Sequence, residues 1–402
     1  MLTENPIPRD IHFSSRTKRM RSNAIREMLQ VTHIPGMISL AGGNPAPETF
    51  PLTLLPKLQD LALKKYGTNA LQYSETEGFE PLRKAIATLL ERKGLPCSTA
   101  KILITNGSQG ALDLLAKVLV DEGTPFAVEV PTYLGALQAF SPFGPLFCPL
   151  ERDRDGVLPA ALKQFAQEHP QGLVYLMPTF SNPTGHCMSM KRRNQLAEII
   201  RIHSLCVIED DPYTELRYEG EKLPPLVALC PDQVIYLGTL SKVFAPGLRL
   251  GFCRAHEDLF SWLVKAKQGT DLHTSTLNQA LAAQYLEDGY LETRLPELRK
   301  IYKSRRDTML ESLKKELPQG FRWSHPSGGM FLWLEGPMDL DVNQLLPLAL
   351  ERGVAFVAGQ AFNPFSGGSQ NCLRLNFSLP DELHIQEGIR RLAASIHHLW
   401  DL

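Results

Sequence analysis

From residue 101 onward, short apolar runs alternate with amphipathic segments, and turns separate the two. Such alternation predicts a mainly parallel sheet covered by helices, and therefore an α/β fold. Ligands of these sheets bind outside the carboxyl ends of the strands, so polar residues at those ends are the candidates for function. The strands are expected at 101–105, 126–130, 147–150, 172–177, 205–208 and 234–238, with helices such as 111–120 and 190–203 between several of them.

The C-terminal third of the chain has a different order of expected elements, which suggests a smaller α+β domain. A long amphipathic helical run is expected from 274 through 313, with an interruption at Pro296. The elements expected after it are strands at 328–334, 354–357 and 372–377 and helices at 342–352 and 381–400. The division that we expect is an N-terminal arm at 1–36, a large domain at 37–288 and a small C-terminal domain at 289–402.

Composition narrows the class of protein. The 402 residues carry a formal net charge of -1, which gives no electrostatic reason to expect nucleic acid or an anionic membrane as a partner. The seven cysteines form an odd set without a CxxC pair, so we expect free thiols in the cytoplasm and no metal site. We find no signal peptide and no apolar run long enough to span a bilayer.

A single lysine stands between two strand-like runs, and its surroundings suggest a cofactor. Lys242 precedes three apolar residues, and partial burial there would lower its pKa. Only a neutral amine attacks a carbonyl to form a Schiff base. Thr239, Ser241 and Arg249 add two hydroxyls and a guanidinium suited to one phosphate. An aldehyde-reactive amine beside a phosphate clamp suggests pyridoxal phosphate, although a lysine in such a place is often a solvated loop residue.

Polar or aromatic residues follow other strands, and each has a simpler explanation beside the functional one. Ser108 begins a helix after a Gly-rich turn, where it caps the helix or binds phosphate. Tyr133 packs in the core or stacks on a flat ring. Asp210 belongs to a hydrated acidic turn, or its carboxylate keeps a pyridine nitrogen protonated. A metal site is a weaker alternative, because no histidine or further acid stands at ligand spacing. Arg374 alternates with leucines, so it faces solvent or a substrate carboxylate.

Three motifs in this order carry a resemblance to a known family: Asn182-Pro-Thr-Gly185, Glu209-Asp-Asp-Pro-Tyr213 and Ser241-Lys-x3-Pro-Gly-x-Arg249. The sequence resembles the class I/II (fold-type I) pyridoxal-phosphate-dependent aminotransferases over nearly the whole chain. Within that family it is most similar to the kynurenine/2-aminoadipate aminotransferases, through the stretches at 38–43, 106–109 and 373–378.

The resemblance implies roles for individual residues. Lys242 would bind the cofactor aldehyde and move the proton of the substrate Cα, Asp210 would pair with the pyridine N–H, and Tyr133 would stack on the ring. The other residues expected to hold the cofactor are Ser108, Gln109, Asn182, Tyr213, Thr239, Ser241, Arg249 and, from a neighbouring subunit, Tyr73. The residues expected to bind the substrate are Asn182 and Arg374 at its α-carboxylate, and Gly43 and Arg26 at its side chain, with Arg16, Arg19 or Arg21 as alternatives to Arg26.

The activity implied is a ping-pong transfer of the amino group of an α-amino acid to a 2-oxo acid such as 2-oxoglutarate. The amino acid would be of the 2-aminoadipate, aromatic or branched-chain type, and the enzyme would be a homodimer with composite active sites. Two alternatives stay open from the residues alone. One is another reaction on the same fold, C–S lysis or decarboxylation, and the other is a non-catalytic module that senses ligands with the cofactor pocket.

Overall fold

A computed structural model describes residues 12–20, 34–365 and 370–401 of the chain. Its larger sheet has seven strands in the order β2-β10-β9-β8-β7-β3-β4. They are β2 (Ile102–Asn106), β3 (Pro125–Glu129), β4 (Leu146–Leu150), β7 (Leu173–Leu176), β8 (Cys206–Asp210), β9 (Val234–Thr239) and β10 (Leu250–Arg254). Only β10 runs antiparallel to its neighbours, so the prediction of a mainly parallel sheet is confirmed.

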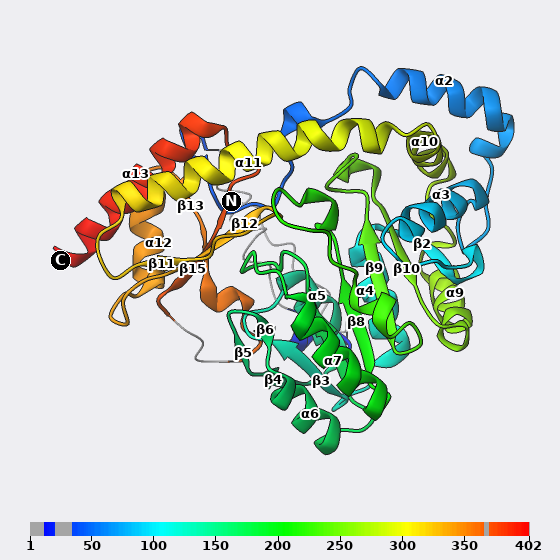
Figure 1. Ribbon diagram of the computed structural model, residues 1–402, viewed down its shortest axis with the longest axis horizontal. Coiled ribbons are helices and arrows are strands. Elements are labelled where there is room, and N and C mark those ends of the chain that lie inside the picture. Colours follow the sequence, from blue (N-terminus) through cyan, green and yellow to red (C-terminus); the bar gives the residue numbers. More distant parts are fainter. Residues whose placement is uncertain (1–11, 21–33, 366–369, 402) are drawn as a thin grey trace.

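Helices cover this sheet on both faces (Figure 1). The strands are apolar because both faces are covered, and every residue of β7 is buried. The helices of this part are α2 (Leu55–Tyr66), α3 (Glu80–Glu91), α4 (Gly107–Leu119), α5 (Leu134–Phe140), α6 (Pro159–Glu168), α7 (Met190–His203), α8 (Leu226–Leu229), α9 (Glu257–Asp271) and α10 (Thr276–Glu287). Short 3-10 helices include η1 (Ser15–Arg19) and η5 (Ser141–Phe143), and a small hairpin joins β5 (Arg152–Asp153) to β6 (Gly156–Val157).

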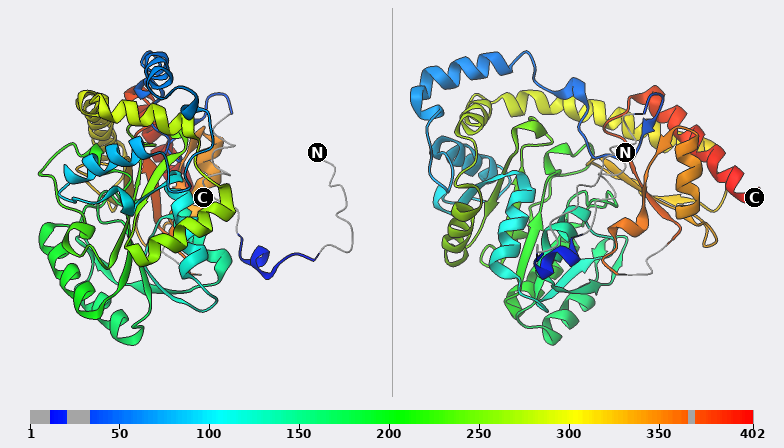
Figure 2. Two further views of the ribbon diagram at one scale, coloured as in Figure 1. Left: turned by 90° about the vertical axis from the view of Figure 1, so that its right-hand side faces the viewer. Right: turned by 180° about the vertical axis from the view of Figure 1, so that it is seen from behind.

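A second, smaller sheet has four strands in the order β11-β12-β15-β14. It is flanked by helices and lies apart from the larger sheet in Figures 1 and 2. Its elements are β11 (Arg322–Trp323), β12 (Phe331–Glu335), β14 (Val357–Ala358), β15 (Cys372–Asn376), the 3-10 helix η8 (Gly359–Phe362), and helices α12 (Val342–Glu351) and α13 (Glu382–Trp400).

The start of the described main body packs with this smaller unit. Strand β1 (Ile38–Ser39) pairs in parallel with β13 (Val354–Ala355). Ile38 and Leu40 are buried in the hydrophobic cluster of the smaller sheet, not in that of the larger one. The sequence placed this segment at the beginning of the large domain, and the division at residues 37 and 288 therefore stays a prediction.

One long helix, α11 (Tyr290–Glu316), contributes to both hydrophobic clusters and crosses from one unit to the other in Figure 1. Its first half buries Leu295 in the larger cluster, and its second half buries Met309 in the smaller one. The predicted interruption at Pro296 is wrong, because Pro296 lies inside the helix. The break falls instead at Gly289, whose positive φ of 73° suits glycine better than any other residue. Burial on both sides of Pro296 offsets the one hydrogen bond that its missing N–H costs.

Candidate active site

A cavity of about 280 Å³ lies where β2, β8 and β9 end, as expected for a parallel sheet. It brings together all the site residues predicted from the sequence except Tyr73 and Arg26. The cavity is lined by Gly43, Asn44, Ser108, Gln109, Tyr133, Met177, Asn182, Asp210, Pro212, Tyr213, Thr239, Ser241, Lys242, Pro246, Arg249, Phe331 and Arg374.

Lys242 has the environment of a reactive amine. It follows β9 and is half-buried, and its Nζ donates a hydrogen bond of 2.8 Å to the carbonyl oxygen of Gly43. Burial lowers the pKa of Lys242 to about 8, and the positive charges of Arg249 and Arg374 contribute to that lowering. A substantial fraction of the amine is therefore neutral just above neutral pH, which is the form that attacks an aldehyde.

Asp210, at the end of β8, keeps one carboxylate oxygen free. The residue is 1% exposed, and burial raises its pKa to about 7. Its Oδ2 accepts a hydrogen bond of 2.8 Å from the hydroxyl of Tyr175, whereas Oδ1 is buried with no hydrogen-bond partner among the described residues. A buried carboxylate oxygen without a partner is costly, and the ring N–H of a pyridinium would satisfy it.

The three consecutive acids of this motif have three different environments. Glu209 accepts hydrogen bonds of 2.9 Å from the backbone N–H groups of Leu226 and Val227, at the start of α8. Asp211 accepts bonds from the hydroxyl of Tyr236 and a backbone N–H. All three acids are buried, so the hydrated acidic turn is wrong. Asp210 is the one of the three that lines the cavity, and the described part of the chain holds no cluster of three potential metal ligands.

The N-terminus of α4 and Arg249 form the anion-binding end of the cavity. The capping position of α4 is Asn106, so Ser108 lies inside the first turn and does not cap the helix. Gly107 has φ of 71°, and a Cβ atom there would lie 2.5 Å from Nη2 of Arg249. The guanidinium thus packs directly on the loop, where helix N–H groups and positive charge together suit a phosphate.

Three of the predicted phosphate ligands form hydrogen bonds with neighbouring groups. The hydroxyl of Thr239 lies 2.9 Å from that of Ser241 and accepts a bond of 3.1 Å from the Ser241 N–H. The side-chain amide of Gln109 donates a bond of 2.9 Å to the carbonyl oxygen of Gly135. Gln109 would therefore reach a phosphate through its backbone N–H at the helix terminus, not through its side chain.

Arg374 is a fully buried cation with an unused donor. Its guanidinium lies 4.2 Å from the ring centre of Phe331 and 4.9 Å from that of Phe362. Nη1 donates a bond of 2.8 Å to Oδ1 of Asn182 and Nη2 donates to the carbonyl oxygen of Ala41, while Nε has no partner among the described residues. The solvent-facing alternative is wrong because β15 is buried on both faces. A buried guanidinium without a counter-ion is set to receive a carboxylate.

Two tyrosines, Tyr133 and Tyr213, also line the cavity. Tyr133 directly precedes α5, and burial raises its pKa to about 12. Burial raises the pKa of Tyr213 further, and its ring meets that of Phe331 edge-on at 5.9 Å between centres. Both phenols therefore stay protonated at neutral pH and can donate hydrogen bonds to a ligand.

The remaining predicted residues do not line the cavity. Tyr73 is 78% exposed and packs edge-on against His273. Arg19 pairs with Glu122 and Arg16 lies over the ring of Phe143. Arg26, the predicted side-chain ligand, and its alternative Arg21 lie outside the described residues.

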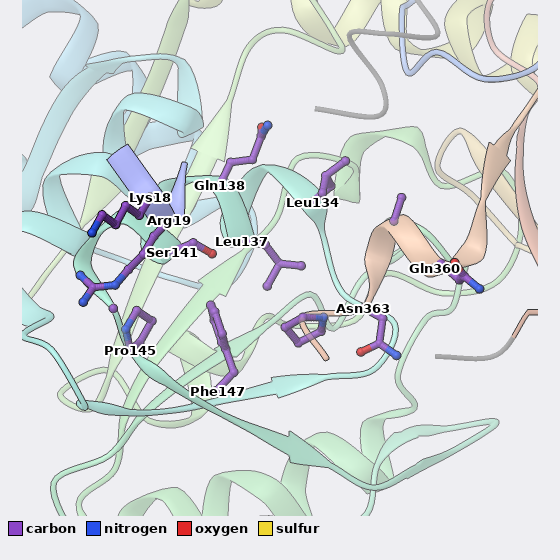
Figure 3. A pocket seen from close by; sticks show the side chains of 13 residues that line it. Lys18, Arg19, Leu134, Leu137, Gln138, Ser141, Pro145, Phe147, Gln360 and Asn363 are labelled. Carbon is purple, nitrogen blue, oxygen red and sulfur yellow. The ribbon is translucent and has the colours of Figure 1, made fainter. Parts of the chain in front are cut away.

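Figure 3 shows a second cavity, of about 470 Å³. It shares no lining residue with the candidate site, but Leu134 on its wall follows Tyr133 in the chain. Its far side is formed by Gln360 and Ala361 of η8, the 3-10 helix that also carries Phe362 against Arg374.

Sequence reasoning missed several residues. Phe331, which stacks on Arg374, lay in a recognised strand but had no distinguishing pattern. Tyr175 carried a usable signal, since a polar atom in a fully buried strand needs a partner. The other missed residues that line the cavity are Asn44, Met177, Pro212 and Pro246.

Comparison with known proteins gives a consistent result. Residues 35–392 match the family described as aminotransferase class I and II. The chain is 42% identical over 392 residues to the aromatic-amino-acid aminotransferase 1 of Thermococcus litoralis, covering 96% of this chain and 94% of the relative. It is 41% identical to the 2-aminoadipate transaminase of Thermus thermophilus, covering 96% and 97%. The crystal structure of α-aminoadipate aminotransferase from Thermus thermophilus, complexed with N-(5′-phosphopyridoxyl)-L-leucine, superposes with a TM-score of 0.89 at 40% identity and covers 97% of this chain and 98% of that one.

Proposed function

The chain belongs to the aminotransferase class I and II family and is a pyridoxal-phosphate-dependent aminotransferase of fold type I, and from its cavity we propose which substrates it takes. The amino donors are 2-aminoadipate, aromatic or branched-chain amino acids, and the acceptor is a 2-oxo acid such as 2-oxoglutarate, in a ping-pong cycle. The observation that carries this proposal is Arg374, which lines the same cavity as Lys242 and has a buried guanidinium nitrogen without a partner among the described residues. An α-carboxylate held by Arg374 would present its amino group toward Lys242.

The residues present fit the cofactor at each of its polar ends. The start of α4, Thr239, Ser241 and Arg249 would hold the phosphate, and Oδ1 of Asp210 would accept the ring N–H. Tyr133 would stack on the ring, while Asn182 and Tyr213 would bond its phenolic oxygen. When bound, pyridoxal phosphate supplies an aldehyde for the amino group and a ring that withdraws electrons from the substrate Cα.

Lys242 would act as the base that takes the proton from the substrate Cα. Its pKa of about 8 suits a group that must be neutral to accept that proton and charged to return it. General-base help of this kind is worth about 10²–10⁴-fold in rate. Asp210 would keep its negative charge opposite the ring nitrogen, and Arg374 with Asn182 would fix the orientation of the Cα–H bond.

The ring of Phe331 lies beside Gly43 in the lining of the cavity, and we expect apolar donor side chains to contact this part of it. Gly43 packs closely on that ring, since a Cβ atom there would lie 2.9 Å from the ring of Phe331. Lys242, Arg249 and Arg374 are the cations among the described lining residues, and each already has a role. A distal carboxylate such as that of 2-aminoadipate would therefore need a cation of the arm, Arg26 or its alternative Arg21. The names of the relatives, for aromatic and 2-aminoadipate substrates, and the leucine adduct in the Thermus structure support this range.

A homodimer with composite sites is part of the proposal. Tyr73 is 78% exposed and does not line the cavity of its own chain, which is what a residue that completes a neighbour's phosphate site requires. Leu272, close to Tyr73 through His273, is also 45% exposed. No described helix is long and apolar enough to cross a membrane. The cytoplasmic location stays a prediction from the cysteine content.

A donor screen tests the proposal. The purified chain, loaded with pyridoxal phosphate, is given 2-oxoglutarate and each of the common amino acids other than glutamate, 2-aminoadipate or kynurenine, and the glutamate formed is measured. We expect the highest kcat/KM with aromatic, branched-chain or 2-aminoadipate donors, and none with Lys242→Ala. Preference for aspartate or alanine would contradict the substrate range. Keto acid formed without 2-oxoglutarate in many-fold excess over the enzyme, beyond the single equivalent per site that the first half-reaction yields, would instead indicate lyase chemistry.

A further inference from the structure

Tyr175 lies beneath the cavity and touches the carboxylate expected to meet the ring nitrogen. It is 1% exposed in the middle of β7, and its Cα is paired with that of Ile208 in β8. Asp210 is two residues further along β8 on the same face, within reach of a long side chain that leans along the strand. The phenol donates its hydrogen bond of 2.8 Å to Oδ2 of Asp210.

The neighbouring acid provides a comparison within the same chain. Tyr236 in β9 donates a bond of 2.6 Å to Oδ2 of Asp211, so each of the two acids has its own tyrosine. The other oxygen of Asp211 accepts a bond of 3.1 Å from the backbone N–H of Thr214, which uses both oxygens. The other oxygen of Asp210 has no partner among the described residues. The Tyr236 pair is thus complete in the folded chain, whereas the Tyr175 pair leaves one oxygen without a hydrogen bond on a residue that lines the cavity.

We propose that Tyr175 is a positioning residue for the reaction: its hydroxyl holds the Asp210 carboxylate ionised and orients Oδ1 toward the ring nitrogen of the cofactor. This inference rests on the role proposed for Asp210. A phenol that donates to one oxygen stabilises the carboxylate against its protonated form. The proton shared between the carboxylate and the ring nitrogen then stays on the nitrogen, where it strengthens electron withdrawal from the substrate.

Among the described residues, no cation is a cause of the shift in the pKa of Asp210, so Tyr175 is the group that stabilises its carboxylate. The groups that change the pKa of Asp210 are the Tyr175 phenol and the like charge of Asp211. The charge of Asp210 in turn raises the pKa of the phenols of Tyr133 and Tyr213. Burial and Asp211 both favour the protonated carboxyl, and the Tyr175 hydrogen bond opposes them. Removal of the hydroxyl therefore moves the shared proton from the ring nitrogen toward Asp210.

The test compares Tyr175→Phe with Tyr236→Phe, which removes the equivalent hydroxyl from a neighbouring part of the sheet. Both enzymes are loaded with pyridoxal phosphate labelled with ¹⁵N in the ring, and the ¹⁵N chemical shift is followed with pH. Tyr175→Phe is expected to move the shift toward the unprotonated nitrogen and to lower kcat roughly ten-fold or more, with the donor KM little changed. Tyr236→Phe is expected to keep the wild-type shift. Thermal midpoints of both variants report any loss of folding.

Asp210→Asn separates two kinds of failure. If Asp210→Asn moves the ¹⁵N shift but Tyr175→Phe does not, the inference about Tyr175 is overturned while the role of Asp210 stands. If Asp210→Asn also leaves the shift unchanged, the role of Asp210 fails first. Equal shifts in Tyr175→Phe and Tyr236→Phe would show a general loss of packing and would likewise overturn the inference.

Discussion

The substitution Asp210→Asn is expected to stabilise the cofactor-free chain while it inactivates the loaded enzyme. Burial raises the pKa of Asp210 from the ordinary 3.8 to about 7, so the folded state binds this proton more tightly than the unfolded state does. Folding is therefore favoured at low pH, and that advantage is lost as the pH rises from about 4 to 7. Asparagine keeps the shape and can still accept from Tyr175, but it carries no charge.

The magnitude follows from the shift in pKa. The rise of the Asp210 pKa from 3.8 to about 7 means that the wild-type carboxylate destabilises the folded chain by about 4 kcal/mol above pH 7. The same relation gives about half of that value near pH 5.5, because the folded-state carboxyl is still protonated there. The stability difference between Asp210→Asn and wild type should thus grow by about 2 kcal/mol between about pH 5.5 and pH 8.

Urea unfolding of the cofactor-free proteins, at one protein concentration and several pH values, measures this difference. The control is Asp113→Asn on α4, which also removes one negative charge but from a side chain that is 44% exposed. Its difference from wild type should be small and nearly independent of pH. An Asp210→Asn variant no more stable than wild type at pH 8, or a difference that does not change with pH, would refute the reasoning.

The cofactor-free chain is expected to bind pyridoxal phosphate covalently at a rate that increases as the pH rises through about 8. The reason is that the amine of Lys242, with its lowered pKa, becomes neutral over this range. A rate measured by stopped flow that does not change with pH would contradict this. Arg374→Ala should raise the donor KM about 10- to 100-fold, the value of a hydrogen-bonded charge, and leave the amount of bound cofactor unchanged. Loss of bound cofactor with a normal KM would assign Arg374 to the cofactor. Mixed dimers of Tyr73→Ala and Lys242→Ala chains should regain activity that neither parent has, since one of their two sites carries both native side chains. No recovery would place Tyr73 outside the neighbour's site.

The sequence predicted the candidate site well where topology alone decides position. Lys242 and Asp210 follow strands of a parallel sheet, and such strand ends must lie together. Arg374 was ambiguous because alternation in β15 does not reveal that both faces of that strand are covered. Pro296 misled because proline penalises a helix locally, whereas burial of Leu295 and Met309 on the two cores is a tertiary effect. The boundary between α10 and α11 lies instead at Gly289, directly before the first residue of α11.

The groups that no motif could mark are those that act through another residue. Tyr175 reaches the site only because the register of β7 against β8 places it two residues short of Asp210. Oδ1 of Asp210 and Nε of Arg374 are buried without partners among the described residues, and an unmade hydrogen bond of this kind costs about 1–3 kcal/mol. A ligand with an N–H at one end and a carboxylate at the other would form hydrogen bonds with both of these atoms. Binding of such a ligand would therefore remove the free-energy cost that the two unmade hydrogen bonds add to the folded chain.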